Sequence, residues 1–235
     1  MRKFSLIISL IACQILNGQT PFNYQIDFKN ILEKTQDMDN SLFYDKLLSR
    51  FSVNDTTLTD QEVLALLIGY TAKPEYKPYS DISTERYIYK LNDEQKFKEA
   101  LDEGIKFLKT HPVSVKALFE IAYSYHKLGA DDSAQYYAYK GRRIFEAMFY
   151  SGDGMTPETP TFALGPADGQ DYILKYVGAE IGTMGSGSDK NGNFLDILQA
   201  KFDNGQIVTL YFIIQHATDK MFSEDELKIM KGQDD

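Results

Sequence analysis

The sequence contains no tryptophan, one cysteine, three histidines and seven prolines in 235 residues. A single cysteine excludes an internal disulfide and any zinc or iron–sulfur site built from several cysteines. The three histidines stand far apart along the chain, so we expect no metal and no cofactor. The net charge of −9 argues against nucleic-acid binding, because that function depends on clustered cations.

The residues that are present describe an ordinary globular protein. Hydrophobic residues make up 43% of the chain and charged residues 25%. Sixteen tyrosines and fifteen phenylalanines supply large apolar side chains for a core in spite of the missing tryptophan. The length allows one or two domains.

The first residues have the layout of a secretory signal peptide. Arg2 and Lys3 precede the apolar stretch Phe4–Leu16, and small and polar residues follow around Gly18. The apolar stretch is shorter than the roughly 20 residues that span a bilayer. We therefore expect residues 1–18 to be removed and the exported protein to be periplasmic or extracellular. A buried N-terminal helix is the alternative.

Cys13 suggests a second way in which this segment could be processed. The sequence Leu10–Cys13 resembles a bacterial lipobox, in which the cysteine is lipidated and becomes the new N-terminus. Apolar residues continue beyond the cysteine as Ile15 and Leu16, which argues against lipidation. A membrane anchor through Cys13 is thus the less favoured alternative, and we expect no transmembrane segment after signal removal.

Apolar periodicity predicts helices in the first part of the exported chain. The predicted helical segments are residues 24–34, 40–51, 59–70, 92–112 and 115–145, the last with a turn at Gly129. Thr59 and Glu62 have the spacing of a capping box. Two prolines within residues 73–81 interrupt the helical pattern.

The clearest pattern lies in residues 115–145, which resemble a tetratricopeptide (TPR) repeat. Residues at the spacings typical of that family are Leu118, Ile121, Ala122, Tyr125, Leu128, Gly129 and Ala134. Ala100 precedes Ala134 by one TPR period, so residues 92–112 resemble the second helix of a preceding repeat. The resemblance implies antiparallel helical hairpins packed through small residues. A helical hairpin without repeat ancestry is the alternative.

The pattern changes after a Gly-, Pro- and Thr-rich connector at residues 150–170. Strands are predicted at residues 172–181, 194–202 and 206–214, with a helix as the alternative for the first. Asn204-Gly205 predicts a tight hairpin between the last two strands. Both faces of the last strand are apolar, so we expect it to be central and covered on both sides. A capping box at Ser223–Glu226 predicts a final helix.

Catalytic and ion-binding motifs are missing from the sequence. Gly182–Asp189 is rich in glycine, but it lacks the Gly-Lys-Ser/Thr ending of a phosphate-binding loop. Asp189, Asn191 and Asn193 alternate as at the start of a calcium loop, yet the glycine and glutamate that such a loop needs are absent. Neither a G-x-S-x-G nor an H-E-x-x-H motif occurs. We therefore assign no catalytic residue.

The TPR resemblance implies a candidate binding groove. In that family the first helix of each pair lines a concave face, and the matching positions here are Lys116, Phe119, Tyr123, His126 and Lys127. Aromatic and basic side chains in a groove suit a peptide. Phe119 and Tyr123 replace the lysine–asparagine pattern of the chaperone-tail-binding TPRs. The alternative is that these aromatic residues pack as core against the C-terminal sheet.

The exported chain also resembles a family of uncharacterised bacterial secreted proteins, a domain of unknown function. The segments that carry this resemblance are Asp55–Thr59, Gly69–Tyr70, Pro78–Tyr79, Ser151–Gly154 and Tyr211–Phe212. The resemblance implies a common fold and no particular activity.

Together these patterns predict an α+β protein. TPR-like antiparallel hairpins (residues 19–149) precede a C-terminal α+β region (residues 150–235) that packs on them as a small antiparallel sheet with a terminal helix. We expect a non-enzymatic protein- or peptide-binding or scaffold role in the bacterial cell envelope. The alternative is an envelope-polymer hydrolase with a carboxylate site near loops 151–170 and 182–193. A hydrolase would show facing carboxyl groups with shifted pKa values in a pocket, and a scaffold would show an open aromatic groove.

Overall fold

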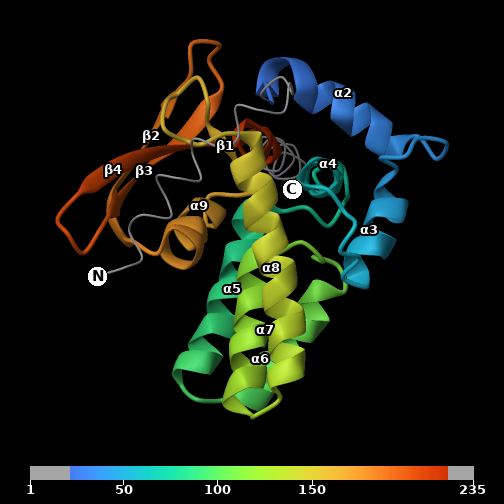
Figure 1. The fold of residues 1–235 in the computed structure, drawn as a ribbon, viewed down its shortest axis with the longest axis vertical. Coiled ribbons are helices and arrows are strands. Elements are labelled where there is room, and N and C mark those ends of the chain that lie inside the picture. The colour runs from blue at the N-terminus through green and yellow to red at the C-terminus, as the bar shows by residue number, and fades with distance from the viewer. Residues whose placement is uncertain (1–21, 222–235) are drawn as a thin grey trace, which may run out of the picture.

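The computed structural model describes residues 22–221. The expected signal peptide, the alternative of lipidation at Cys13 and the capping box at Ser223–Glu226 lie outside these residues. Helices build the first part of the described chain and a four-stranded sheet the second, which confirms the α+β class (Figure 1). Within residues 22–221 no helix combines the length and the apolar character needed to cross a bilayer.

The helical part consists of seven helices in the described chain. They are α2 (Tyr24–Gln36), α3 (Tyr44–Ser52), α4 (Asp60–Tyr70), α5 (Pro78–Asp93), α6 (Phe97–Leu108), α7 (Val115–Lys127) and α8 (Asp131–Ser151). The capping box of α4 is confirmed, with Thr59 accepting from the backbone of Glu62 and Glu62 accepting from the backbone of Thr59. The prediction of helix was wrong for residues 94–96, because α5 ends at Asp93, Gln95 takes a left-handed φ of 60° and α6 begins at Phe97.

Helices α5 to α8 form successive antiparallel hairpins that run side by side through the lower part of Figure 1. Small residues let their backbones approach. A Cβ added to Gly104 of α6 would lie 2.6 Å from Cγ1 of Ile121 on α7, and one added to Gly141 of α8 would lie 2.6 Å from the ring of Phe119. Gly129 ends α7 with a φ of 77°, as the predicted turn requires.

The sheet has the strand order β1-β4-β3-β2. Its strands are β1 (Thr161–Phe162), β2 (Glu180–Ser188), β3 (Phe194–Lys201) and β4 (Ile207–Ile213). The hairpin between β3 and β4 is confirmed, and Gly205 supplies the positive φ of 83° in its turn. The sheet is mixed rather than purely antiparallel, because the connector contributes β1, which pairs in parallel with β4.

Residues 172–181 are not one strand. The short helix α9 (Asp168–Asp171) continues as the π-helical turn η2 (Tyr172–Val177), Gly178 ends it with a φ of 73°, and β2 begins at Glu180. Tyr172 and Ile173 are both buried, so the consecutive apolar residues here belong to a helical turn that packs against the core. The sequence pattern alone does not separate this case from a buried strand.

Strand β4 is central, between β1 and β3, as expected. One face packs on α9 and η2, where Phe212 meets Tyr172 edge-on at 5.8 Å. The opposite face is only partly covered, since Ile207 is 54% exposed and Tyr211 is half-buried. The expectation of complete cover on both sides was therefore wrong for this part of the strand.

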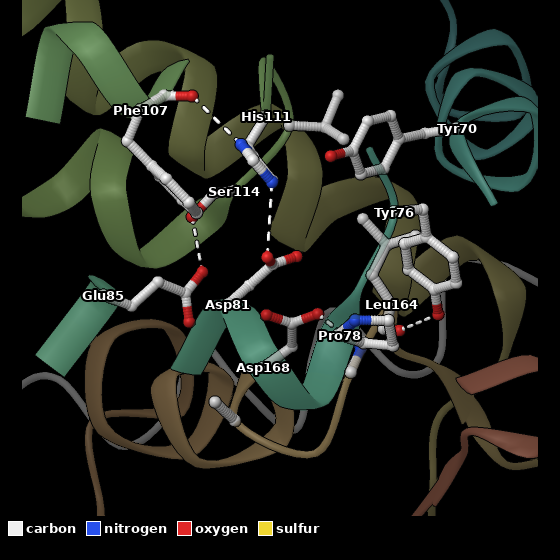
Figure 2. Close-up of a pocket in the computed structure, with 13 residues that line it drawn as sticks. Tyr70, Tyr76, Pro78, Asp81, Glu85, Phe107, His111, Ser114, Leu164 and Asp168 are labelled. Atoms are coloured by element: carbon white, nitrogen blue, oxygen red, sulfur yellow. Dashed lines mark hydrogen bonds and ion pairs between the residues drawn. The ribbon is translucent and has the colours of Figure 1, made fainter. Parts of the chain in front are cut away.

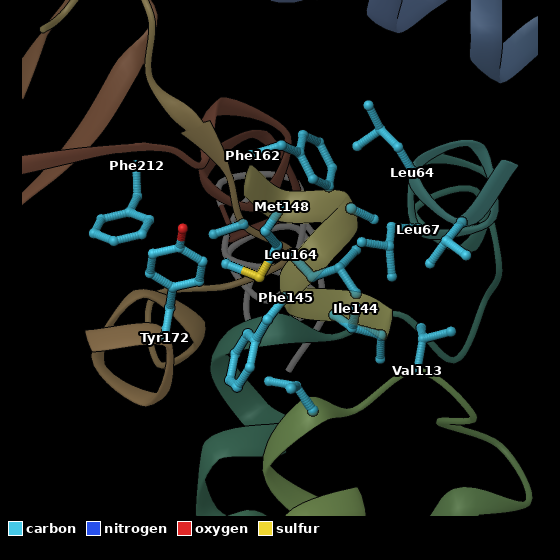
Figure 3. Packing of buried hydrophobic residues seen from close by; sticks show 14 of the residues in the cluster. Leu64, Leu67, Val113, Ile144, Phe145, Met148, Phe162, Leu164, Tyr172 and Phe212 are labelled. Atoms are coloured by element: carbon cyan, nitrogen blue, oxygen red, sulfur yellow. The ribbon is translucent and has the colours of Figure 1, made fainter. Parts of the chain in front are cut away.

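One hydrophobic cluster joins the helices to the sheet (Figure 3). Phe145 and Met148 of α8 lie at its centre, Leu64 and Leu67 of α4 approach from one side, and residues of the sheet region approach from the other. Helix α4 is buried along nearly its whole circumference, which explains its almost uniformly apolar sequence. The helices and the sheet thus share a core.

Candidate functional site

A pocket opens where the helical part meets the loop that follows β1 (Figure 2). It holds about 400 Å³ of empty space, part of which is open to solvent. Its charged walls are the acidic side chains Asp81, Glu85 and Asp168 and the basic side chain His111, and its aromatic walls are Tyr70, Tyr76 and Phe107. One basic group therefore faces three acidic ones.

Local structure explains why these side chains meet. Asp81 and Glu85 are four residues apart on α5, which places both on one face of the helix. His111 lies in the turn between α6 and α7, and Asp168 is the first residue of α9. Tyr76 fixes the loop after β1, because its buried hydroxyl donates a hydrogen bond to the carbonyl of Leu164.

His111 is paired with Asp81. Its Nε2 lies 3.3 Å from Oδ1 of Asp81, its Nδ1 lies 3.2 Å from the carbonyl oxygen of Phe107, and its ring stacks on Phe107 at 4.0 Å. Burial alone would lower the pKa of His111, but the hydrogen bond and charge of Asp81 outweigh it and raise the pKa above its usual value. Asp81 thus has a basic partner in the pocket wall.

Glu85 is buried, with 8% of its surface exposed. The hydroxyl of Ser114 donates a 2.6 Å hydrogen bond to Oε1 and also accepts from the backbone N–H of Ala117, as the N-cap of α7. Burial raises the pKa of Glu85, and the charges of Asp171 and Asp81 add to the rise, while the Ser114 bond opposes it. Ser114 is thus a cap and a positioning group.

Asp168 accepts a 2.9 Å hydrogen bond from the backbone N–H of Gly165 through Oδ2. Burial, reinforced by the charge of Glu85, raises the pKa of Asp168 to about 8, so this carboxyl group carries a proton at neutral pH. Within residues 22–221 neither Glu85 nor Asp168 forms an ion pair with a basic side chain. The pocket therefore contains two carboxyl groups without a matching cation.

Lys116 and Lys175 form ion pairs with carboxylates other than Glu85 and Asp168. Lys116 lies 3.4 Å from the buried Asp171, and Lys175 lies 3.1 Å from Asp171 and 3.4 Å from Glu120. These contacts fasten α9 and η2 to α7. They neutralise Asp171 and Glu120 and leave the pocket carboxyl groups unmatched.

The five groove candidates do not form one surface. Lys116 is engaged with Asp171, and Phe119 stacks on Phe145 at 5.3 Å, so both take part in packing. Tyr123, His126 and Lys127 are exposed; the Lys127 ammonium lies 5.2 Å from the Tyr123 ring centre. Phe119 thus packs against the core, whereas the side chains in the last turns of α7 are exposed.

Loop 182–193 contains no carboxylate site of the kind expected for a hydrolase. Both oxygens of Asp189 are occupied: Oδ1 accepts from the backbone N–H groups of Asn191 and Asn193, and Oδ2 accepts from the side chain of Asn193. These bonds lower the pKa of Asp189 in spite of its partial burial. In the described part of the chain no group of three or more His, Cys, Asp and Glu side chains could hold a metal ion.

Sequence reasoning found only part of the acidic pocket. The hydrolase alternative placed a carboxylate site near loop 151–170, which contains Asp168, but it did not include Asp81 and Glu85 of helix α5. The available signal was the i, i+4 pair Asp81 and Glu85 directly after the prolines. The contribution of Asp168 depends on how the loop after β1 folds back, which no local pattern encodes.

Comparison with known proteins gives a family and no relative of established function. Neither the curated proteins nor the solved structures include a significant match to this chain. Residues 29–222 match a domain of unknown function, DUF4919, and this segment contains the pocket, the helical hairpins and the sheet. On this match the chain belongs to the DUF4919 family.

Proposed function

We propose that this chain is an exported, non-enzymatic binding protein of the bacterial cell envelope, and that its acidic pocket holds a positively charged group of a protein or peptide partner. The group would be an ammonium or a guanidinium, as on a lysine or arginine side chain. The observation that carries the proposal is the pair of carboxyl groups, Glu85 and Asp168, which face the pocket and form no ion pair with a basic side chain of residues 22–221.

The charge imbalance gives the pocket a chemical preference. A buried carboxyl group without a counter-ion stays protonated, because burial penalises its charged form. A ligand cation between Glu85 and Asp168 would restore the ionised forms and pair with them. Binding would then release protons, since the pKa of each carboxyl group would fall.

The remaining walls suit the same ligand. Tyr70 and Tyr76 line the pocket, and aromatic rings attract ammonium and guanidinium groups at their faces, whereas one face of Phe107 is already stacked on His111. The pocket volume of about 400 Å³ accommodates the end of one side chain. The net charge of −9 favours encounter with a basic partner.

The helical hairpins support a scaffold role of TPR-like type. Helices α5 to α8 stack as successive antiparallel pairs, and Ala100 and Ala134, one repeat period apart, are both buried. The exposed Tyr123, His126 and Lys127 at the end of α7 offer a second contact surface for a bound peptide.

Small organic cations test the pocket directly. We would titrate n-butylammonium and n-butylguanidinium into the isotope-labelled chain and follow the amide signals of His111, Gly165 and Asp168 by NMR. n-Butanol, which has the same alkyl chain without the charge, is the control ligand. The expected result is a saturable shift with the cations that the alcohol does not produce.

Matched variants distinguish binding in the pocket from nonspecific attraction of cations to the negatively charged chain. Asp168→Asn and Glu85→Gln each remove an ionisable carboxyl group from the pocket with little change in shape, and we expect both to abolish the shift. Glu103→Gln removes a charge from the exposed surface of α6 and should leave it intact. Equal responses to butylammonium and butanol, or a response unchanged in Asp168→Asn, would refute the proposal.

One observation favours a hydrolase as the second candidate. A glycosidase needs one protonated and one ionised carboxyl group. The pocket offers Asp168, whose pKa is raised to about 8, and Asp81, which pairs with His111. Release of reducing ends from purified envelope glycans would support this candidate if Asp168→Asn abolished it and the Tyr123→Ala/His126→Ala double variant retained it.

A further inference from the structure

Strand β2 forms an outer edge of the sheet, and nothing in the described part of the chain pairs with its free side. Exposed strand edges are usually protected by charges, prolines or short length, because their free N–H and C=O groups can recruit another strand. The opposite edge, β1, is only two residues long. Strand β2 has nine residues, and its residues 181–188 include neither a charged residue nor a proline.

The second half of β2 is the part suited to pairing. The register with β3 shifts between Ile181 and Met184, and from Met184 to Ser188 it is continuous. The outer edge is therefore regular over this segment. Met184 is 56% exposed, and a Cβ added to Gly185 would meet no atom of residues 22–221 within 4 Å apart from those of its neighbours in sequence.

We propose that Met184–Ser188 pairs antiparallel with the same segment of a second copy of this chain, so that the two sheets join across a two-fold axis near Ser186. Identical antiparallel strands are self-complementary by symmetry. In this register Met184 faces Ser188 of the other copy, and no charges oppose each other.

Charge favours this edge as the contact between copies. Two chains of net charge −9 repel each other over most of their surfaces, so a contact needs a neutral region. The Met184–Ser188 segment itself carries no charge, and the nearest acidic residues in the sheet and the chain are Asp196, which is the cross-strand partner of Ser186 on β3, and Asp189. The half-covered face of the sheet beside it, with Ile197 and Tyr211, would continue across the joint.

Sedimentation of residues 19–235 over a concentration series tests the proposal. We expect the mass to rise from one chain toward two. Met184→Lys would place an ammonium group at each end of the paired segment and should keep the chain monomeric, because charged side chains protect a strand edge. Met38→Lys, the same substitution at a 71% exposed position in the loop after α2, should dimerise like the wild type. Circular dichroism would establish that both variants are folded.

A cysteine provides an independent test of the register. Residues 19–235 contain no cysteine, so Ser186→Cys introduces a unique one close to the proposed axis. Mild oxidation should link two copies through Ser186→Cys and should not link them through Ser49→Cys on α3. A wild type that stays monomeric at every concentration, or a dimer that persists in Met184→Lys, would overturn the proposal, as would an edge that binds only an unrelated extended peptide.

Discussion

The imidazole of His216 lies flat against the ring of Phe162, with 4.6 Å between ring centres and 10° between ring planes. Phe28 of α2 stacks at 5.4 Å, and the hydroxyl of Tyr24 lies 3.3 Å from Nδ1. His216 is 7% exposed, and within residues 22–221 its Nε2 has no hydrogen-bond partner. One neutral histidine therefore joins α2, β1 and the helical residues 215–221.

This environment predicts that acid destabilises the fold through His216. Burial lowers the pKa of His216 from 6.5 to about 3, so the unfolded chain binds a proton first as the pH falls. The free energy of unfolding should decrease as the pH falls from 6.5 toward 3. His216→Phe keeps a stacked ring and removes the proton site, so its stability should decline less over that range. Urea denaturation at several pH values would measure the free energy of unfolding of both proteins. An equal decline in the two proteins would contradict the prediction.

The environment of Asp168 predicts the opposite pH dependence of the free energy of unfolding. Burial raises its pKa from 3.8 to about 8, so the unfolded chain loses a proton first as the pH rises. The contribution of Asp168 to stability is complete at low pH and is lost as the pH rises from 3.8 through 8. Asp168→Asn should therefore gain stability relative to the wild type at pH 8, although it loses the proposed cation site. Thermal unfolding of both proteins at each end of this range provides the measurement.

Gly104 predicts a cost for adding a methyl group to a helix. Alanine normally stabilises a helix by about 1 kcal/mol relative to glycine. Here the added Cβ would lie 2.6 Å from Cγ1 of the buried Ile121, and such overpacking costs about 1–3 kcal/mol. We expect Gly104→Ala to lower the free energy of unfolding on balance. The loss should vanish in an Ile121→Ala background; if it persists there, the close contact is not its cause.

The capping box of α4 predicts a smaller loss in the free energy of unfolding when its threonine is replaced. Thr59 accepts from the backbone N–H of Glu62 at 3.2 Å, and Arg50 holds Glu62 and Asp55 in place. Thr59→Ala should cost about 1 kcal/mol in urea denaturation, as is typical of a lost N-cap. Thr59→Ser keeps the hydroxyl and should retain most of the stability. A loss as large in the serine variant would locate the effect in the methyl group instead.

Short-range patterns predicted most of the helices and the β3–β4 hairpin. Thr59 and Glu62 mark a helix start because the bonds that they make join residues three positions apart. Gly129 and Gly205 mark turns because each adopts the positive φ that other residues disfavour. The two errors in helix and strand extent, at Gln95 and at residues 172–177, occur where local propensity is ambiguous and packing against the core decides.

The acidic pocket was outside the reach of such patterns. Asp81 and Asp168 are separated by most of the helical part of the chain, and they meet because the loop after β1 returns to α5 (Figure 2). The parallel pairing of β1 with β4 directs that return, and a two-residue strand leaves almost no periodic signal. The shifted pKa values also depend on burial, which is a property of the assembled fold.

The sequence by itself determined the α+β class, the helical hairpins and the acidic, cysteine-poor composition, because these follow from local periodicity and residue counts. Tertiary structure alone decided that Phe119 packs against the core while Tyr123 stays exposed, that Glu85 and Asp168 share a pocket and form no ion pair within residues 22–221, and that β2 ends the sheet. Each of these depends on which distant segments cover a side chain or a backbone edge. These distant segments decide how strongly a charge is desolvated and whether a strand edge is paired. The residues next to it in the sequence decide neither.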